Sequence, residues 1–335
     1  MIADTINKYG CTDNKLSQRG RGMAAIWTMG ELLVEIMRPR ADMSMFEAGE
    51  FLGPYPSGAP AIFIDTAARL GHQAGIIGGV GNDDFGKCLL DRLEKDGVDC
   101  RFVDKVDGIA TGVAFVTYRG DGSRQFIYHI GNTPAAMALA PDVSKISGPA
   151  FFHVMGCSLL ANEGFRAEII KTLNAFVNAG AKVSFDPNVR IELLGPRGFE
   201  EIILPVLEHC AVLQPGVDEL LMLSGKPTIE AAVEKLFVNP KLEIIALKRG
   251  SKGCTVFTRD GRFDLGVHQI DPIDPTGAGD SFDAAFLCGL IEKKSVEECA
   301  RMATATAALN TSAFGPMEGK ISSDSVAEMM KRPLV

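Results

Sequence analysis

The chain has 335 residues, of which 46 % are hydrophobic and 23 % are charged, ordinary values for a folded protein with a substantial core. Its formal charge of −8 gives no basic stripe of the kind that nucleic-acid binding needs. No stretch approaches the run of about 20 apolar residues that would cross a membrane. We therefore expect a protein that acts on small molecules and binds neither nucleic acid nor membrane.

The first 22 residues are polar and contain no apolar core of a secretory signal. The first strand-like segment follows Met23 directly. We therefore predict an N-terminal extension over residues 1–23 and a single folded domain over residues 24–335, with Met23 as a possible alternative start. A chain that begins at Met23 is expected to fold and function like the full chain.

Apolar runs of strand length alternate with amphipathic helical patterns along the rest of the chain. Such alternation predicts an α/β fold with a mostly parallel sheet covered by helices on both faces. The predicted strands are 24–29, 74–80, 150–156, 181–186, 211–215 and 243–248. The predicted helices are 59–71, 84–97, 162–180, 198–210, 228–237, 279–293 and 295–312.

One section departs from this alternation. The segment "TGVAFVTYRGDGSRQFIYHIG" (111–131) has two alternating stretches joined by Gly-Asp-Gly, which predicts a β-hairpin. Together with the irregular segment 36–57, it predicts a small β appendage formed by residues 36–57 and about 109–133.

The eight cysteines form no C-x-x-C pair and the five histidines form no cluster of metal-binding spacing. Several cysteines fall inside apolar helical runs, where a thiol behaves as a small hydrophobic group. This usage is typical of unpaired thiols in a cytoplasmic protein.

The strongest chemical signal is the turn "DPTGAGD" (274–280), which comes immediately before an apolar helical run. Glycines allow a ligand to approach the backbone closely. The first N–H groups of a helix lack internal partners and attract anions. Asp280 would therefore lie beside a bound phosphate, although the turn by itself also fits an ordinary helix start stabilised by an acidic residue.

The surrounding sequence resembles the ribokinase family, the PfkB-type carbohydrate kinases. The turn in the context "DPTGAGDSFDAAFLCGL" resembles the family's C-terminal signature, and "SGAPAIFIDTAARLG" with the following "IIGGVGNDDFGKCLLDRLEKDGVD" resembles its N-terminal signature. "MGELLVE", "DPNVR" and "ALKRGSKG" occur in the family's order. The resemblance covers about residues 24–320.

The resemblance implies a three-layer α/β/α fold with a small β-sheet lid, and transfer of the γ-phosphoryl group of ATP to a sugar hydroxyl. Phosphoryl transfer needs positioning, charge neutralisation and a base for the attacking hydroxyl. Asp280 would be this base. The backbone of Gly277, Ala278 and Gly279 would form an anion hole with it.

The resemblance also implies the remaining site residues. The ATP-binding residues would be Asn188, Lys248, Gly250, Ser251, Gly253, Gly277 and Gly279. The sugar-binding residues would be Glu35, Gly58, Ala59, Tyr128, Arg190 and Asp280. Glu219 would assist Mg²⁺, and Asp274 with Thr276 would form a possible K⁺ site. ATP and Mg²⁺ are thus the expected cofactors, and a homodimer that pairs through the lid is the expected assembly.

Three positions depart from the family pattern. Ile62 replaces an asparagine of the N-terminal signature, and Gly216 replaces the asparagine of the N-x-x-E motif. Glu35 replaces the aspartate that usually ends the family's opening strand, which places Glu35 at the end of the first strand. These departures leave open a binding protein of the same fold without efficient catalysis, and kinases for 2-keto-3-deoxygluconate, ribose or a nucleoside. The hairpin has no arginine between Tyr128 and Ala136, which favours a neutral ketohexose such as fructose or tagatose over a sugar acid.

Overall fold

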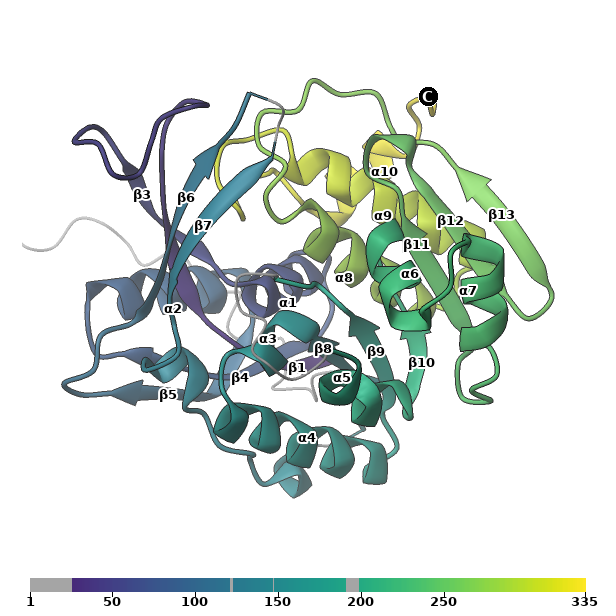
Figure 1. Cartoon of the computed structure of the whole chain (residues 1–335), viewed down its shortest axis with the longest axis horizontal. Helices are drawn as coiled ribbons and strands as arrows, with labels where there is room; N and C mark the ends of the chain where they lie inside the picture. Colours follow the sequence, from purple (N-terminus) through teal and green to yellow (C-terminus); the bar gives the residue numbers. More distant parts are fainter. Residues whose placement is uncertain (1–25, 121–122, 147, 191–198) are drawn as a thin grey trace, which may run out of the picture.

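The computed structural model describes residues 26–120, 123–146, 148–190 and 199–335. The predicted extension 1–23 and the alternative start at Met23 lie outside the described residues. Within the described part, the chain forms one large sheet between two layers of helices and a second, smaller sheet that projects from one edge of the large sheet (Figure 1).

The large sheet has nine strands in the order β13-β12-β11-β10-β9-β8-β1-β4-β5. The strands from β5 to β11 run parallel, and β12 and β13 are added antiparallel at one edge. Their bounds are β1 Ile26–Met29, β4 Ala74–Gly81, β5 Asp99–Val106, β8 Phe151–Met155, β9 Lys182–Asp186, β10 Cys210–Leu213, β11 Ile244–Lys248, β12 Cys254–Thr258 and β13 Gly261–Leu265.

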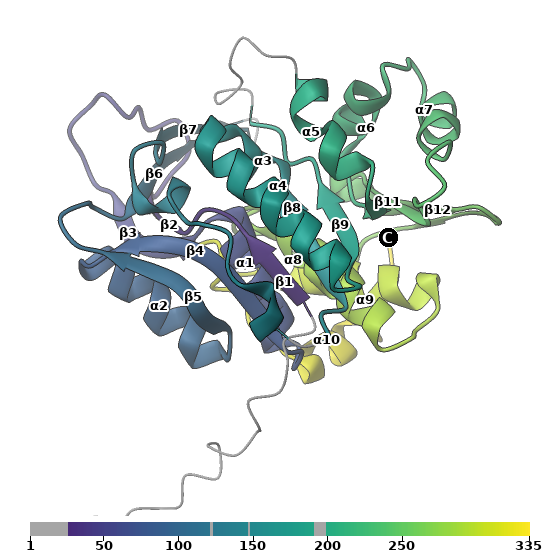
Figure 2. The same ribbon diagram turned by 90° about the horizontal axis from the view of Figure 1, so that it is seen from below.

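Two separate hydrophobic cores fill the space between this sheet and its helices. The first core lies under α1, α2, α8, α9 and α10, and the second lies under α4, α5, α6 and α7. Figure 2 shows α2 and α4 on opposite faces of the sheet. Both faces are apolar because a parallel sheet covered on both sides has no solvent-facing residues. The helices are α1 Ala59–Arg69, α2 Asp84–Asp96, α3 Gly156–Leu160, α4 Glu163–Asn178, α5 Phe199–Leu207, α6 Val217–Ser224, α7 Ile229–Leu236, α8 Ala278–Ile291, α9 Val296–Asn310 and α10 Ser323–Met329.

The small sheet has four strands in the order β3-β2-β6-β7, with β2 and β6 parallel and the two outer pairs antiparallel. Its strands are β2 Leu33–Met37, β3 Leu52–Ser57, β6 Gly112–Tyr118 and β7 Arg124–His129. The predicted hairpin is therefore present. The sheet, called the lid below, begins at Leu33 rather than at residue 36.

All six predicted strands and all seven predicted helices are present. The sequence prediction missed β5, the β12–β13 hairpin and three short helices, α3, α6 and α10. These elements are short, or lie at the edge of the sheet where only one side is buried, so their apolar pattern is weak.

Candidate active site

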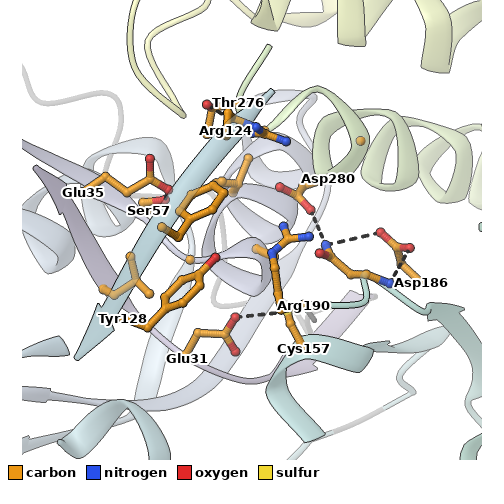
Figure 3. A pocket seen from close by; sticks show the side chains of 18 of the residues that line it. Glu31, Glu35, Ser57, Arg124, Tyr128, Cys157, Asp186, Arg190, Thr276 and Asp280 are labelled. Carbon is orange, nitrogen blue, oxygen red and sulfur yellow. Dashed lines mark hydrogen bonds between the residues drawn. The ribbon is translucent and has the colours of Figure 1, made fainter. Parts of the chain in front are cut away.

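The carboxyl ends of the parallel strands and the inner face of the lid enclose a cavity of about 200 Å³ (Figure 3). A second cavity of about 370 Å³ lies on the other side of the α8 N-terminus. Lys248 and Gly279 line both cavities. Ligands of open parallel sheets bind at this edge of the sheet, so two ligands placed here would meet at the start of α8.

Helix α8 begins at a turn that only glycine can make. Gly277 has φ 78°, in the left-handed region, and a Cβ there would lie 2.6 Å from the carbonyl oxygen of Pro316. The N–H of Ala278 points back to the Pro275 carbonyl oxygen at 3.3 Å. We therefore expect Gly279 and Asp280 to contribute more to an anion hole than Ala278, whose N–H is already engaged.

Asp280 lies in the first turn of α8 and lines the cavity under the lid. Its Oδ1 accepts a hydrogen bond of 3.1 Å from Nδ2 of Asn188. Burial raises the pKa of Asp280 to about 7, and the neighbouring carboxylate of Asp186 raises it as well. A carboxylate with a pKa near neutrality is suited to accept a proton from a hydroxyl.

Glu35 also lines this cavity, but its position in the fold differs from the sequence prediction. We placed it at the end of the first strand of the main sheet, whereas it lies within β2 of the lid. Its Oε1 accepts a hydrogen bond of 2.7 Å from Ser57, and Oε2 has no hydrogen-bond partner among the described residues. Burial raises the pKa of Glu35 to about 7. An unpaired buried oxygen at a cavity wall is suited to accept a ligand hydroxyl.

Glu31 occupies the place that we assigned to Glu35, immediately after β1. Its carboxylate accepts hydrogen bonds from the Cys157 thiol at 3.2 Å and from the Ser158 hydroxyl at 2.5 Å. Burial raises its pKa. A Cβ on Gly58 would lie 2.4 Å from the Glu31 carbonyl oxygen, so glycine at that position lets the start of α1 pack against Glu31. Glu31 is not among the site residues predicted from the sequence.

The lid contributes the aromatic and basic side chains of strand β7. Tyr128 and Phe126 stack at 5.3 Å between centroids, and both line the cavity. Arg124 also lines it and donates a hydrogen bond of 3.2 Å to Thr276 Oγ1. His129 points to the outer face of the lid, where it is exposed. The hairpin therefore brings an arginine to the cavity, four residues before the stretch in which we had looked for one.

Arg190 enters the cavity from the loop after β9. Figure 3 shows its guanidinium between Tyr128, Glu31 and Asp280. Its position in the cavity under the lid is consistent with the predicted contact to the sugar. Residues 191–198, which follow it, lie outside the described residues.

The second cavity has a mainly apolar wall with a rim of backbone. It brings together Lys248 and the three predicted nucleotide-binding residues of the β11–β12 turn, Gly250, Ser251 and Gly253. Helix α9 and the residues before α8 supply its apolar side chains. An apolar slot beside a helix N-terminus is suited to a nucleotide, with the base in the slot and the phosphates at the helix. Asn188 and Gly277, which we had also assigned to the nucleotide, line the cavity under the lid instead.

Lys248 ends β11 and lies between two carboxylates. Its Nζ is 2.8 Å from Asp186 Oδ2 and 2.9 Å from Asp283 Oδ2. Burial alone would lower the pKa of Lys248, but the two carboxylates raise it. Burial alone would raise the pKa of Asp186, but Lys248 and the neighbouring Asp283 together hold it below its usual value. Neither Asp186 nor Asp283 is among the site residues predicted from the sequence.

Glu219 lines the cavity from the first turn of α6, as its predicted role in assisting Mg²⁺ requires. Its two oxygens accept backbone N–H groups of Val189 at 2.8 Å and Gly216 at 2.7 Å. Gly216, which replaces the family's asparagine, therefore still anchors this glutamate through its backbone. Each carboxylate oxygen has a second lone pair, and Glu219 lines the cavity, so it fits a contact to a metal-bound water.

The predicted K⁺ site at Asp274 and Thr276 has few free ligands. Asp274 accepts hydrogen bonds from Tyr118, from the N–H of Thr276 and from the N–H of Gly315, at 2.8–2.9 Å. Thr276 Oγ1 is already bonded to Arg124. Elsewhere among the described residues, no three His, Cys, Asp or Glu side chains lie close enough together to hold a metal ion by themselves.

The structure thus brings nearly all the predicted residues to the two cavities. Asp274 is the exception, because it is buried behind the cavity wall. The cavity residues to which sequence reasoning assigned no role include Glu31, Ser57, Arg124, Phe126, Cys157 and Asp186. For Glu31 a signal was present, since an acidic residue after the first buried strand falls at the binding edge.

The pfkB family carbohydrate kinase model matches residues 39–322 of this chain. Among curated proteins, "Fructokinase-1" of Oryza sativa subsp. japonica is 31 % identical over 91 % of this chain and 97 % of its own length. Among solved structures, a candidate ribokinase II from E. coli in complex with ATP and Mg²⁺ is 35 % identical, with a TM-score of 0.86 over 92 % of this chain and 99 % of that chain. The fructokinase of Vibrio cholerae O395, solved with fructose, ADP and calcium, has the same fold, with a TM-score of 0.79 at 24 % identity over 92 % of this chain and 99 % of that chain.

The chain belongs to the PfkB family of carbohydrate kinases. It is an ATP-dependent sugar kinase with the ribokinase-like fold, as the sequence predicted. No helix in the described part of the chain is both long and apolar enough to cross a membrane.

Proposed function

We propose that this kinase phosphorylates a neutral ketohexose, with fructose as the preferred substrate, and that Asp280 is its catalytic base. The observation that carries the proposal is the position of Asp280. It lies at the boundary of the two cavities, at the N-terminus of α8, with its pKa raised by burial to about 7.

In the proposed reaction, the sugar lies under the lid and the nucleotide lies in the apolar cavity. Asp280 accepts the proton of the attacking hydroxyl as that oxygen forms its bond to the γ-phosphorus. The bond from the γ-phosphorus to the bridging oxygen of ADP breaks, and ADP leaves with that electron pair. The N–H groups of Gly279 and Asp280 stabilise the negative charge on the transferred group.

Glu219 is the residue that would hold a Mg²⁺-bound water, and the ion would neutralise phosphate charge. The charge balance of the cavity supports a need for such a cation. Its wall carries five acidic side chains (Glu31, Glu35, Asp186, Glu219 and Asp280) and three basic ones (Arg124, Arg190 and Lys248).

The same excess of acidic side chains supports a neutral sugar as the substrate. A sugar acid would add a carboxylate to a wall that already has an excess of acidic groups, and an unpaired buried charge is costly. Arg124 is committed to Thr276. Glu31 and Glu35 offer acceptors for hydroxyl groups, and the curated relative named above acts, by its name, on fructose.

A coupled assay with fructose, tagatose, ribose, 2-keto-3-deoxygluconate and a set of nucleosides tests the substrate. We expect the highest kcat/KM with fructose. A clear preference for the sugar acid would show that Arg124 and Arg190 serve a carboxylate. Binding of sugar and nucleotide without turnover of any member of the panel would favour the alternative of a non-catalytic relative.

Three further proposals concern the setting of the enzyme. A K⁺ ion would bind near Asp274 and Thr276 only by rearranging their present hydrogen bonds, so assays in K⁺ and in tetramethylammonium test it. A homodimer through the lid is supported by the exposed apolar side chains of its outer face, among them Ile127. A cytoplasmic location is supported by the seven cysteines of the described part, which are all unpaired, and cell fractionation tests it.

A further inference from the structure

We propose that Asp186 is a positioning residue that acts on the base Asp280 through the side-chain amide of Asn188, and that Lys248 fixes Asp186 in place. The inference rests on the proposed role of Asp280 as the base. It assigns a function to Asp186 and a second function to Lys248, beyond lining the nucleotide cavity.

The evidence is a continuous chain of contacts across three elements. Lys248 Nζ, at the end of β11, is 2.8 Å from Asp186 Oδ2, at the end of β9. The Asn188 amide nitrogen is 3.5 Å from the same Asp186 oxygen and 3.1 Å from Asp280 Oδ1. Asp186 and Asp280, both labelled in Figure 3, are thus within reach of the same amide nitrogen. All four side chains are buried or nearly so.

The two carboxylates decide which way the amide faces. Ionised carboxylates only accept hydrogen bonds, whereas an amide offers two N–H donors on its nitrogen and an acceptor on its oxygen. With Asp186 on one side and Asp280 on the other, the nitrogen end must lie between them. A rotated amide would place its oxygen against a carboxylate oxygen. Asp186 therefore favours the one orientation in which Asn188 donates to the base.

The backbone of Asn188 shows that its position is held by its contacts. Its φ is 37°, in the left-handed region that residues other than glycine adopt at a cost. The Asn188 N–H donates to Asp186 Oδ1 at 3.2 Å, so Asp186 binds both the backbone and the side chain of Asn188. The Asn188 Oδ1 atom is buried with no partner among the described residues, which is consistent with an orientation set by its nitrogen.

The charged groups that face Asp280 come from several elements. They are Asp186 from β9, Arg190 from the loop that follows it, Lys248 from β11 and Arg124 from the lid. Among these groups, Asp186 is the one whose hydrogen-bond partner, the Asn188 amide, also donates to Asp280. Removing it would leave the base present but free to adopt more than one orientation, and a displacement of about 1 Å at a reacting group can cost about 100-fold in rate.

Asp283 provides a matched control. It is the second carboxylate of Lys248, with its Oδ2 2.9 Å from Nζ, and it is as deeply buried as Asp186. Among the described residues, Asp283 makes no hydrogen bond with the Asn188 side chain. Burial and the neighbouring Asp186 raise the pKa of Asp283, so Asp283→Asn does not remove the same charge as Asp186→Asn. It changes the other carboxyl group beside Lys248 and leaves both contacts of the Asn188 amide in place.

We expect Asp186→Asn to lower kcat by about 10- to 100-fold with little change in the KM for sugar. The acid limb of its pH–kcat profile should shift relative to that of the wild type, since the base loses a nearby negative charge. Asp283→Asn should retain most of kcat. Equal losses in the two variants, or a normal kcat in Asp186→Asn, would overturn the proposal.

A double-mutant cycle with Asn188→Ser tests whether Asp186 acts through the amide. If it does, Asp186→Asn has little further effect on kcat once Asn188 is serine. Additive losses would overturn the inference. Melting temperatures monitor folding, and if Asp186→Asn does not fold, Asp186→Glu replaces it. This variant keeps the charge toward Lys248 but displaces the acceptor, and it should also lower kcat.

Asp280→Asn, measured first, separates this inference from the proposed function. If Asp280→Asn retains turnover, the proposed base is wrong. If Asp280→Asn loses turnover while Asp186→Asn keeps it, the base stands and only the positioning role of Asp186 fails.

Discussion

At the scale of single residues, the site is built from carboxylates whose surroundings give them different proton affinities. Asp280 and Glu35 are buried with their pKa values raised to about 7, whereas Lys248 keeps the pKa of Asp186 low. Since a base must be unprotonated and an orienting group must stay ionised, this division fits the roles proposed for Asp280 and Asp186.

Replacing Asp280 by asparagine should lower kcat by about 10²- to 10⁴-fold, the usual range for a general base. ATP affinity should change little, because the backbone N–H groups of the turn remain and a negative charge is lost. Steady-state kinetics and nucleotide titration measure the two effects. Asp84→Asn, in the first turn of α2, is the control for a pure helix-end effect, and it should leave kcat unchanged.

The same substitution should alter stability in a pH-dependent way. The folded-state pKa of Asp280, about 7, lies above the ordinary aspartate value of 3.8, so the fold loses stability as pH rises between these values. Asp280→Asn should therefore melt at a higher temperature than the wild type at pH 8 and at a similar temperature near pH 4. A lower melting temperature at pH 8 would show that Asp280 is mainly structural.

The wild-type enzyme should show kcat/KM rising with pH through an apparent pKa near 7, because the free enzyme must carry ionised Asp280. Glu35 titrates in the same range, so the profile reports both groups. Measuring the kcat/KM profile again with Glu35→Gln separates the two groups. We expect the rise of kcat/KM with pH to persist in this variant. Loss of the limb in that variant would assign it to Glu35.

Glu31→Gln should raise the KM for sugar by about 10-fold or more, because hydrogen bonds to charged groups are worth about 1.5–3 kcal/mol. The KM for ATP should not change, since Glu31 lines only the cavity under the lid. Cys157→Ser keeps a donor to Glu31 and should have a much smaller effect. An unchanged sugar KM in Glu31→Gln would limit Glu31 to a packing role.

At the scale of elements, α1 carries a buried acidic residue that the catalytic mechanism does not use. Asp65 is 1 % exposed, and neither of its side-chain oxygens has a hydrogen-bond partner among the described residues. Its contact with Arg69 is 3.6 Å long. Burial raises its pKa to about 7, and the nearby Asp96 of α2 raises it as well.

Asp65→Asn should therefore stabilise the enzyme above pH 7, where the wild type holds a buried charge. The gain should shrink as pH falls toward 4, since the folded-state pKa of Asp65 is the raised one. One pKa unit corresponds to about 1.4 kcal/mol, so an increase of several degrees in melting temperature is expected at pH 8. Kinase activity should be unchanged. Asp91→Asn, at an exposed position of α2, is the control, and an equal gain there would contradict the explanation.

At the scale of the whole molecule, the lid has two chemically different faces because side chains alternate along a strand. On β7, Arg124, Phe126 and Tyr128 face the cavity, while Ile127 on the other face is 44 % exposed. Phe51, which immediately precedes β3, adds to the exposed apolar surface of the lid. This surface is the one proposed for pairing with a second copy.

If the lid pairs, sedimentation should detect a dimer at micromolar concentration, and Ile127→Lys should shift it to a monomer. A charge at the centre of an apolar contact is unfavourable without a partner. Lys87→Glu, on the exposed surface of α2, should leave the dimer intact. A wild-type protein that is monomeric at all concentrations would contradict the proposal.

The sequence by itself determined the order of most elements and the start of α8. Both depend on local properties: apolar spacing within a segment, and a glycine at a position with positive φ. The GAGD turn is contiguous in sequence, so the role of Asp280 could be inferred from the residues next to it. The family resemblance likewise depends on short contiguous motifs in a fixed order.

Only the tertiary structure decided which distant polar residues meet. Lys248 bonds to Asp186 across 62 residues of sequence, and Asn188 bonds to Asp280 across 92. Arg124 and Asp283 have no local pattern that separates them from ordinary surface charges. Their proximity arises because parallel strands end at one edge of the sheet and the lid folds over it. Burial at that edge then sets their proton affinities, a property that depends on surroundings rather than on residue type.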